Sequence, residues 1–122
     1  MCIEDNRLNM DLMIHLFRTL PDMELICAEN AEAGLELALS EQPALILMDI
    51  HLPGMNGYEA LEALRNHRET AEIPVIALSS FAMADDIEKG LAAGFAEYVT
   101  KPIDIKAFIS LIDKMVRRSP VK

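Results

Sequence analysis

Asp49 is the residue in this sequence that is best placed to carry out chemistry. It closes an uncharged apolar run that begins at Ala44, and the loop after it contains Pro53 and Gly54. A short run without charges predicts a strand buried on both faces, as in a parallel sheet flanked by helices. The carboxyl end of such a strand is where open α/β sheets bind ligands and present reacting groups. Asp49 is therefore a candidate for a nucleophile or a ligand.

Four other polar residues follow predicted strands in the same way. The acidic pair Glu4 and Asp5 follows the apolar run at the start of the chain. Ser79 ends a fourth apolar run, and Lys101 follows a fifth. Because the carboxyl ends of parallel strands meet at one edge of a sheet, we expect these carboxylate, hydroxyl and ammonium groups to converge there. This convergence is the main sequence evidence for function.

Strand and helix patterns alternate along the whole chain. We expect strands over residues 1–4, 23–28, 44–49, 74–79 and 95–100, and helices over residues 7–20, 31–40, 58–66, 85–93 and from 105 onward. Asn6, Asn30 and Asp104 are predicted helix N-caps, Pro21 stops the first helix, and Gly94 ends the fourth. Five β–α units with right-handed crossovers predict a doubly wound α/β fold of three layers, with residues 1–122 as one domain.

The first and last helices carry the clearest apolar faces. In both, large apolar residues recur at helical spacing, which predicts that they point toward the sheet. In the first helix these residues are Leu8, Leu12, Met13, Leu16, Phe17 and Leu20, and in the last they are Ile105, Phe108, Ile109, Ile112, Met115 and Val116. In the fourth helix Ile87 and Leu91 are the only large apolar residues, so we expect it to be weakly anchored.

Composition and charge restrict the possible functions. The chain has 122 residues, a length typical of one domain, and 52% of them are apolar, which excludes a disordered chain. A net charge of -9 excludes a nucleic-acid-binding surface, which requires clustered Lys and Arg. We expect neither a membrane span nor a signal peptide, because no apolar run is long enough and acidic residues come early. Cys2 and Cys27 match no metal or redox spacing, which predicts buried, reduced thiols in a cytoplasmic protein.

Four segments of the chain resemble the receiver domain of two-component response regulators. They are the stretches from Ile3 to Asn6, from Leu47 to Tyr58, from Pro74 to Ser79 and from Tyr98 to Asp104. They occur in the order and at the spacing of that family, cover essentially the whole chain, and are closest to receivers attached to hybrid sensor kinases. The resemblance implies a flavodoxin-like parallel sheet of five strands in the order 2-1-3-4-5, with five helices.

The resemblance also implies a magnesium site. In that strand order the first and third strands are neighbours, roughly 4.8 Å apart, which brings Glu4, Asp5 and Asp49 together. Three carboxylates at one edge repel one another, and a hard divalent cation such as Mg²⁺ removes the conflict. By resemblance, Asp5 and Asp49 would bind the ion directly, Glu4 through water, and His51 through its backbone carbonyl.

A phosphorylated Asp49 is the central functional expectation from the resemblance. Asp49 would attack phosphorus and form an acyl phosphate, with a phosphohistidine on a histidine kinase or phosphotransfer protein as donor, and water would slowly reverse the reaction. Lys101 would supply a mobile positive charge to one phosphoryl oxygen, and Ser79 a hydroxyl donor to another. The family's usual cis bond before Pro102 would aim the lysine inward. The protein would catalyse only its own phosphorylation and dephosphorylation, and it would not otherwise be an enzyme.

The resemblance further implies a switch. The phosphoryl group would draw the Ser79 hydroxyl toward Asp49, and Tyr98 would then turn inward. The face formed by the fourth helix, fifth strand and fifth helix would change, and a downstream effector or output domain would bind it. His51 and Phe81, two residues after Asp49 and Ser79 respectively, are candidates for tuning the lifetime of the phosphoryl group through the access of water.

Several alternatives stay open from the sequence. Ser80 competes with Ser79 as the hydroxyl donor, and Tyr98 is also compatible with ordinary core packing. The chain could instead be a receiver-like docking module that works without phosphorylation, and it could be a monomer or a dimer. An aspartyl-phosphate phosphatase or phosphotransferase of another family is disfavoured, because such enzymes commonly have a second Asp where this chain has His51. Flavin binding is disfavoured because no hydroxyl-rich phosphate loop follows the first strand.

The first strand departs from the family pattern. Only Met1, Cys2 and Ile3 precede Glu4, where a receiver usually has a longer apolar run. A truncated central strand would lose buried area and backbone hydrogen bonds. Either an upstream segment completes the strand or the short form is real. In the second case we expect a loosely held Asp5, weak metal binding and exposed strand edges that favour dimerisation.

Overall fold

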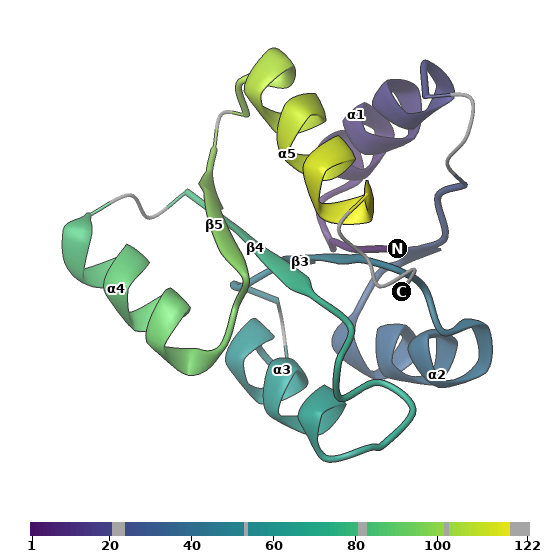
Figure 1. Cartoon of the computed structure of the whole chain (residues 1–122), viewed down its shortest axis with the longest axis vertical. Coiled ribbons are helices and arrows are strands. Elements are labelled where there is room, and N and C mark those ends of the chain that lie inside the picture. Colours follow the sequence, from purple (N-terminus) through teal and green to yellow (C-terminus); the bar gives the residue numbers. More distant parts are fainter. Residues whose placement is uncertain (21–23, 53, 81–82, 102, 118–122) are drawn as a thin grey trace.

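Five parallel strands form the centre of the computed structural model, which describes residues 1–20, 24–52, 54–80, 83–101 and 103–117 (Figure 1). They are β1 (Cys2–Ile3), β2 (Cys27–Ala28), β3 (Ile46–Asp49), β4 (Val75–Ser79) and β5 (Glu97–Thr100). In the sheet they lie in the order β2-β1-β3-β4-β5, and every neighbouring pair is parallel. This is the doubly wound, flavodoxin-like topology that the sequence predicts, including the short first strand.

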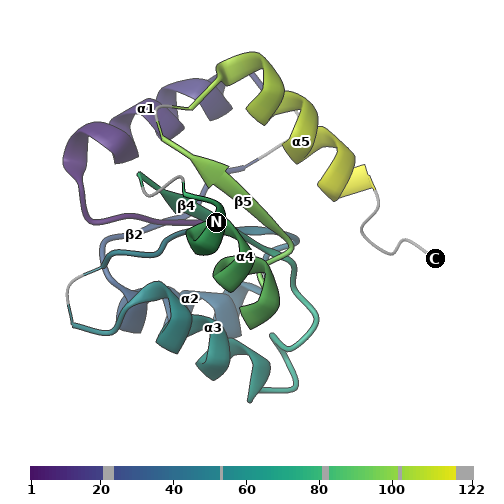
Figure 2. The same ribbon diagram turned by 90° about the vertical axis from the view of Figure 1, so that its left-hand side faces the viewer.

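Helices cover both faces of the sheet, which gives the fold three layers. The helices of the described chain are α1 (Arg7–Arg18), α2 (Ala31–Glu41), α3 (Gly57–Arg65), α4 (Ala84–Ala93) and α5 (Ile105–Arg117). Figure 2 shows α1 and α5 together on one side of the strands, and α2 and α3 on the other. Because all five strands are parallel, they end at the same edge of the sheet.

Successive residues of the central strands supply two separate cores, one on each face. β3 and β4 are buried along their whole length, as expected for strands covered on both faces. The core on the α1–α5 side includes Met10, Met13, Leu16, Leu47, Ile76, Leu78, Phe108 and Ile112. The core on the α2–α3 side includes Ile3, Ala38, Ile46, Met48, Leu61, Leu64, Val75 and Ala77.

Local capping interactions set the ends of the helices. The side-chain oxygens of Asn6, Asn30 and Asp104 each accept a hydrogen bond from the backbone N–H three residues later, at 3.1, 2.8 and 3.2 Å. Gly94 ends α4 with a φ of 116°, a left-handed conformation that glycine adopts without strain. These caps confirm the corresponding sequence predictions, whereas Pro21 lies outside the described residues.

The buried face of α1 differs from the predicted one. Leu8 is 80% exposed and Leu12 is 39% exposed, so the expectation that they point toward the sheet is wrong. The residues that α1 buries are Met10, Met13 and Leu16. Residues spaced by four advance about 40° around a helix at each step, so a row of leucines that begins at Leu8 does not stay on one face.

The start of α5 requires a similar correction. Ile105, expected inward, is 48% exposed in the first turn of the helix. Phe108 and Ile112 are buried as predicted, because they lie further along the helix, where it packs over the sheet. The side chain of Val116 lies outside the described part of the chain.

β2 is shorter than the strand predicted over residues 23–28, since residues 24–26 are not in the strand. β2 lies at the edge of the sheet and pairs only with β1, which is itself two residues long. A strand without a partner cannot satisfy its backbone groups in a ladder, so the short β1 limits β2. Cys2 is fully buried as predicted, whereas the prediction of a buried thiol is wrong for Cys27, which is only partly buried at this edge strand; both thiols are free.

Candidate functional site

The polar residues that follow the strands meet in a cleft at the carboxyl edge of the sheet. The cleft has a volume of about 600 Å³. Its lining residues are Glu4, Asp5, Asn6, Asn9, Asp49, His51, Ser80 and Lys101. The structure therefore brings together the two acidic segments and the lysine that the sequence singled out, although they are far apart along the chain.

The acidic cluster is built by the pairing of β1 with β3. The register between these strands places Glu4, which follows β1, beside Asp49, which ends β3. Glu4 is 1% exposed and Asp49 is 6% exposed, while Asp5 is open to solvent. Oxygen atoms of the three carboxylates lie within 4.8 Å of one another. Two buried carboxylates and one exposed carboxylate thus share one small volume.

Lys101 neutralises part of this negative charge. Its Nζ lies 3.1 Å from Oε1 of Glu4 and 3.5 Å from Oδ2 of Asp49. The backbone N–H of Lys101 donates a 2.8 Å hydrogen bond to the carbonyl of Ser79, which ties the lysine to the end of β4. The ammonium therefore bridges two carboxylates that come from different strands.

Backbone groups hold the two buried carboxylates in place. The N–H of Asn6 donates to Oε2 of Glu4 at 3.2 Å, and the N–H of His51 donates to Oδ1 of Asp49 at 3.0 Å. The pKa of Glu4 is nevertheless raised above its usual value, first because burial disfavours the charged form, and then through a hydrogen bond and charge repulsion with Asp49. Lys101 and the Asn6 N–H oppose this shift without cancelling it.

The two serines at the end of β4 occupy different positions. Ser79 is fully buried and pairs with Thr100 of β5. Ser80 is exposed and lines the cleft. Asn9, which also lines the cleft, is a residue that sequence reasoning missed. The sequence could have indicated Asn9, because it lies three residues after the predicted N-cap Asn6. A residue at that spacing lies in the first turn of α1, beside the acidic pair.

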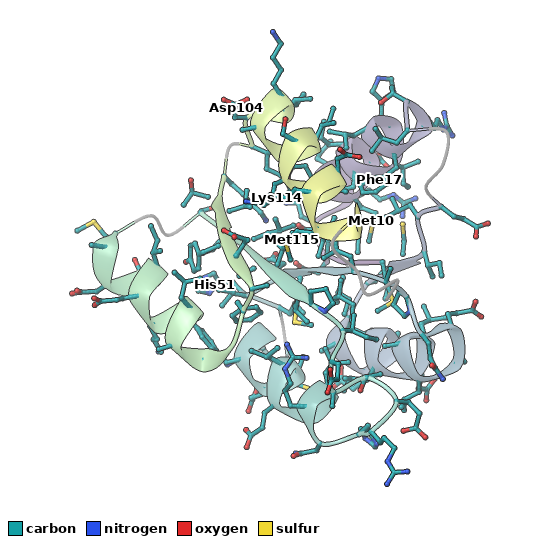
Figure 3. All side chains as sticks on the ribbon, in the orientation of Figure 1. Met10, Phe17, His51, Asp104, Lys114 and Met115 are labelled. Atoms are coloured by element: carbon teal, nitrogen blue, oxygen red, sulfur yellow. The ribbon has the colours of Figure 1, made fainter. Side chains whose placement is uncertain are left out.

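The remaining residues singled out from the sequence lie around the cleft or outside the described chain. His51 lies on the α4 side of the sheet with an exposed side chain (Figure 3). Tyr98 is partly buried on β5 and is not among the cleft-lining residues. Phe81 and Pro102 lie outside the described residues, so the lifetime role of Phe81 and the bond before Pro102 stay predictions.

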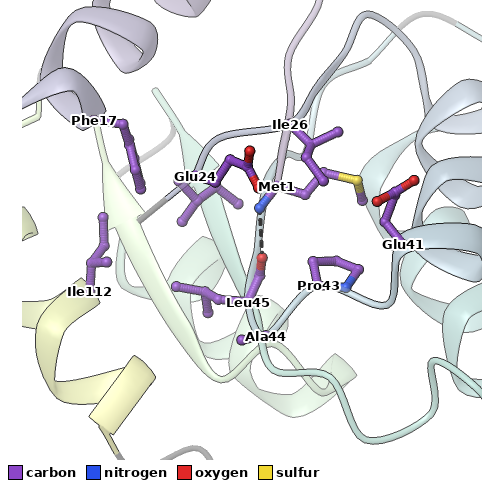
Figure 4. Close-up of a pocket in the computed structure, with 10 residues that line it drawn as sticks. Met1, Phe17, Glu24, Ile26, Glu41, Pro43, Ala44, Leu45 and Ile112 are labelled. Carbon is purple, nitrogen blue, oxygen red and sulfur yellow. Dashed lines mark hydrogen bonds between the residues drawn. The ribbon is translucent and has the colours of Figure 1, made fainter. Parts of the chain in front are cut away.

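A second cavity, of about 290 Å³, lies away from this cleft, near the amino ends of β1 and β3 (Figure 4). Most of its described lining residues are apolar in type, and the carboxylates of Glu24 and Glu41 are also among them. The carbonyl of Leu45 in its wall accepts a 2.8 Å hydrogen bond from the Met1 nitrogen. Among the described residues, its lining contains neither a hydroxyl nor a lysine, and the acidic cluster and Lys101 lie in the other cleft.

Comparison with known proteins identifies the fold. A family model for the response regulator receiver domain matches residues 1–113. The chain belongs to the response regulator receiver family. Receivers are signalling modules of two-component systems and do not form a standard class of enzyme.

Curated relatives of this receiver cover nearly the whole chain. The polar-differentiation response regulator DivK of Brucella anthropi is 41% identical over 112 residues, which are 92% of this receiver and 90% of the relative. DivK of Brucella abortus is 40% identical over the same share of both chains. The similarity therefore extends over nearly the whole chain.

Solved structures show the same fold. The receiver domain of the sensor histidine kinase PA1611 from Pseudomonas aeruginosa, 26% identical, superposes with a TM-score of 0.86 over 95% of this chain and 94% of its own. That structure has a magnesium ion coordinated in its active site cleft. The signal receiver domain of a histidine kinase from Syntrophus aciditrophicus is 21% identical and has a TM-score of 0.87, over 99% of this chain and 91% of its own.

No helix in the part of this receiver that the structure describes has both the length and the apolar character needed to span a membrane.

Proposed function

We propose that this receiver accepts a phosphoryl group on Asp49 from a phosphohistidine of a histidine kinase or a phosphotransfer protein, in a reaction that depends on Mg²⁺. The observation that carries the proposal is the position of Lys101, whose ammonium lies between the buried carboxylates of Glu4 and Asp49. Residues 1–122 act together as one receiver domain in this proposal.

The acidic cluster fits a magnesium ion. Glu4, Asp5 and Asp49 each offer an oxygen ligand within 4.8 Å of the others, and Mg²⁺ prefers oxygen ligands and retains several waters. The exposure of Asp5 leaves room for those waters. Asp5 and Asp49 would hold the ion directly, Glu4 through water and His51 through its backbone carbonyl. The bound ion supplies positive charge that neutralises the carboxylates and the phosphoryl oxygens.

Asp49 is the nucleophile. One of its carboxylate oxygens forms a bond to phosphorus while the bond between phosphorus and the donor's imidazole nitrogen breaks, and the nitrogen keeps the electron pair. The N–H of His51, at 3.0 Å from Oδ1, fixes the orientation of the carboxylate. Asp49 is buried yet faces the cleft, so the donor must bring its phosphoryl group into the cleft to react.

Lys101 and a serine stabilise the phosphoryl group after transfer. Lys101 exchanges its contact with Asp49 for one with a phosphoryl oxygen, and its backbone hydrogen bond to Ser79 limits how far it moves. Ser79 donates its hydroxyl to a second oxygen, in keeping with its place at the end of β4. Ser80 is the other candidate donor, because it already lines the cleft. Separate Ser79→Ala and Ser80→Ala variants distinguish the two by their phosphorylation rates.

Phosphorylation switches the face formed by α4, β5 and α5. Movement of the Ser79 hydroxyl toward the phosphoryl group frees space that Tyr98 then occupies, and the changed face binds an effector or output domain rather than nucleic acid. His51 and Phe81 control the access of water and hence the lifetime of the acyl phosphate. Replacing either one changes the dephosphorylation rate and leaves phosphorylation possible. We place the protein in the cytoplasm, where free thiols such as those of Cys2 and Cys27 stay reduced.

Phosphorylation measured by intact mass tests the proposal. With acetyl phosphate and Mg²⁺, the wild-type protein should gain the mass of one phosphoryl group, and Asp49→Asn should gain none. Asp11→Asn is the matched control, because Asp11 is an exposed carboxylate of α1 that does not line the cleft. Equal mass gain in the wild type and Asp49→Asn would exclude Asp49 as the acceptor. No gain in the wild type would favour a docking module that works without phosphorylation, an alternative to which the two-residue β1 lends support.

A further inference from the structure

α4 is attached to the rest of the receiver mainly by aromatic contacts. Among its described residues only Gly90 is buried, and Leu91 is 46% exposed. The two cores described above contain no large apolar side chain of α4. A helix with so little aliphatic burial depends on the few contacts it does make, which are centred on Gly90.

The ring of Tyr98 lies directly against Gly90. A Cβ atom added to Gly90 would lie 2.6 Å from Cδ2 and 2.9 Å from Cε2 of Tyr98. Carbon atoms pack best at about 3.5–4.0 Å, so any side chain at residue 90 would overlap the ring. Tyr98 cannot simply move away with its strand, because β5 is paired with β4 and Tyr98 is opposite Ala77. The close approach therefore requires glycine.

Tyr58 of α3 completes the contact from the other side. Its hydroxyl oxygen lies 3.8 Å from the same Cβ position at Gly90. The Nζ of Lys89, on α4, lies 5.0 Å from the centre of the Tyr58 ring, which is a cation–π distance. The ring also packs edge-on against Phe95 with a centroid distance of 5.7 Å. Tyr58 of α3 thus contacts α4 through the charge of Lys89, and it contacts the residue after the Gly94 cap through the aromatic pair with Phe95.

This group of residues is connected to the phosphorylation cleft. A cavity of about 170 Å³ is lined by Ile50, His51, Tyr58, Asp86, Lys89 and Tyr98. Ile50 and His51 directly follow Asp49, and the N–H of His51 is bonded to the Asp49 carboxylate. The cavity therefore lies between Ile50 and His51, which follow the acceptor residue Asp49, and α4, the helix that moves in the proposed switch.

We propose that Gly90, Tyr98, Tyr58 and Lys89 form a clamp that holds α4 in its unphosphorylated arrangement, with Gly90 and Tyr58 as positioning residues of the switch. The inference rests on the proposed function, because it names what resists the switch that phosphorylation drives. Tyr98 leaves Gly90 only when the clamp opens. The strength of the clamp consequently sets the population of the switched state and the apparent affinity for anything that binds that state.

The Gly90→Ala variant tests the clamp. We measure the ring NMR signals of Tyr98 in the unmodified protein, and the dissociation constant for beryllofluoride, a phosphoryl mimic, with Mg²⁺. The added methyl group displaces the Tyr98 ring, so its signals should move toward those of the beryllofluoride-loaded wild type. Beryllofluoride should bind roughly threefold to tenfold more tightly, because less of its binding energy is used to open the clamp. With two tyrosines in the chain, the ring signals are simple to assign.

Helix propensity provides the control. Alanine favours a helix more than glycine does, so Gly90→Ala also stiffens α4 itself. Ala92→Gly changes the propensity in the opposite direction at an exposed position of the same helix. If propensity alone acts, the two variants should shift beryllofluoride affinity in opposite directions and leave the Tyr98 ring signals in place.

Variants of Lys89 give a second test that does not depend on the folding of Gly90→Ala. Lys89→Met keeps the aliphatic stem and removes the ammonium, and should tighten beryllofluoride binding about twofold to threefold. Lys89→Arg keeps a cation over the Tyr58 ring and should restore the wild-type value. Unchanged Tyr98 signals in Gly90→Ala, together with equal affinities for the Lys89 variants, would overturn the clamp. If the wild type binds no beryllofluoride, the proposed function fails, and displacement of the Tyr98 ring signals of Gly90→Ala from their positions in the unmodified wild type then decides for or against the clamp.

Discussion

Replacing Lys101 with methionine should destabilise this receiver and strengthen its binding of Mg²⁺. The side chain of Lys101 is 16% exposed, and its Nζ lies 3.1 Å from Glu4 and 3.5 Å from Asp49. With an effective dielectric constant of about 20, Coulomb's law gives an attraction of roughly 5 kcal/mol for each contact. The cost of removing the ammonium from water opposes that attraction, and loss of one partner of a buried ion pair typically costs about 3–5 kcal/mol.

Glu4 limits the loss. Burial and the neighbouring Asp49 already raise its pKa, so Glu4 takes up a proton more readily than an ordinary carboxyl once the lysine is gone. We therefore expect the free energy of unfolding at neutral pH to fall by about 2 to 3 kcal/mol in Lys101→Met, at or just below the lower end of the range for buried pairs. Mg²⁺ should bind the variant roughly tenfold more tightly, a change of about 1.4 kcal/mol, because the ammonium no longer repels the ion.

Urea denaturation with and without MgCl₂ measures both effects. Mg²⁺ stabilises the folded state according to its affinity, so the difference between the wild type and Lys101→Met should shrink as the Mg²⁺ concentration rises. Lys106→Met is the matched control, because Lys106 is an exposed lysine of α5, and it should change the unfolding free energy by less than about 0.5 kcal/mol. A loss in Lys101→Met that is the same at every Mg²⁺ concentration would refute the view that lysine and metal compete for one acidic cluster.

Four further predictions concern the scaffold and the two thiols. Asn56 begins α3 with a capping box. In urea titrations, Asn56→Ala should lower the free energy of unfolding by about 1 to 2 kcal/mol. An unchanged urea midpoint would contradict the role of the cap. In thermal unfolding, Met13→Ala should lower the free energy of unfolding by about 2 to 4 kcal/mol, and Leu8→Ser should lower it by less than about 0.5 kcal/mol. Similar losses in the two variants would mean that the buried face of α1 is misassigned. Burial raises the pKa of Cys2 from 9.0 to about 12, so Cys27 should react first with a thiol reagent at mildly alkaline pH, as mass mapping would show. Because folding keeps the Cys2 thiol protonated, its contribution to stability is complete below pH 9.0 and is lost as the pH rises toward about 12, and a flat stability profile in that interval would exclude it.

The fold class and the convergence of the acidic cluster could be predicted from local signals in the sequence, whereas the order of the strands was implied by the family resemblance. Asp49 ends a charge-free run, and such a run fits only a strand covered on both faces. Parallel connections then force every strand to end at the same edge, so Glu4 and Lys101 come near Asp49 without any long-range information. The helix caps at Asn6 and Asn30 are local in the same sense, since each needs only a side chain and a backbone group three residues away.

The features that the sequence could not supply depend on partners distant along the chain. The length of β2 is limited by β1, so Leu25 and Ile26 continue the apolar pattern but lie outside the strand. Leu8 and Ile105 look like core residues by type, yet they lie in first turns of their helices, where they remain exposed. The close contact between Gly90 and Tyr98 joins α4 to β5, and glycine in a helix gives no indication of which ring lies against it.

The two-residue β1 has a consequence for how the sheet opens. It lies between β2 and β3, and the ladder that attaches β2 to it includes the bonds from the Cys2 N–H to Ile26 at 2.9 Å and from the Glu4 N–H to Ala28 at 3.0 Å. So short a ladder makes the β1–β2 edge a region where amide protons exchange with solvent through local opening, ahead of the central strands β3 and β4. Since Glu4 is the residue at the end of this ladder, a cation or phosphoryl mimic held between Glu4 and Asp49 slows that exchange. Deuterium uptake at the Glu4 amide then becomes a direct gauge of whether the cleft is filled.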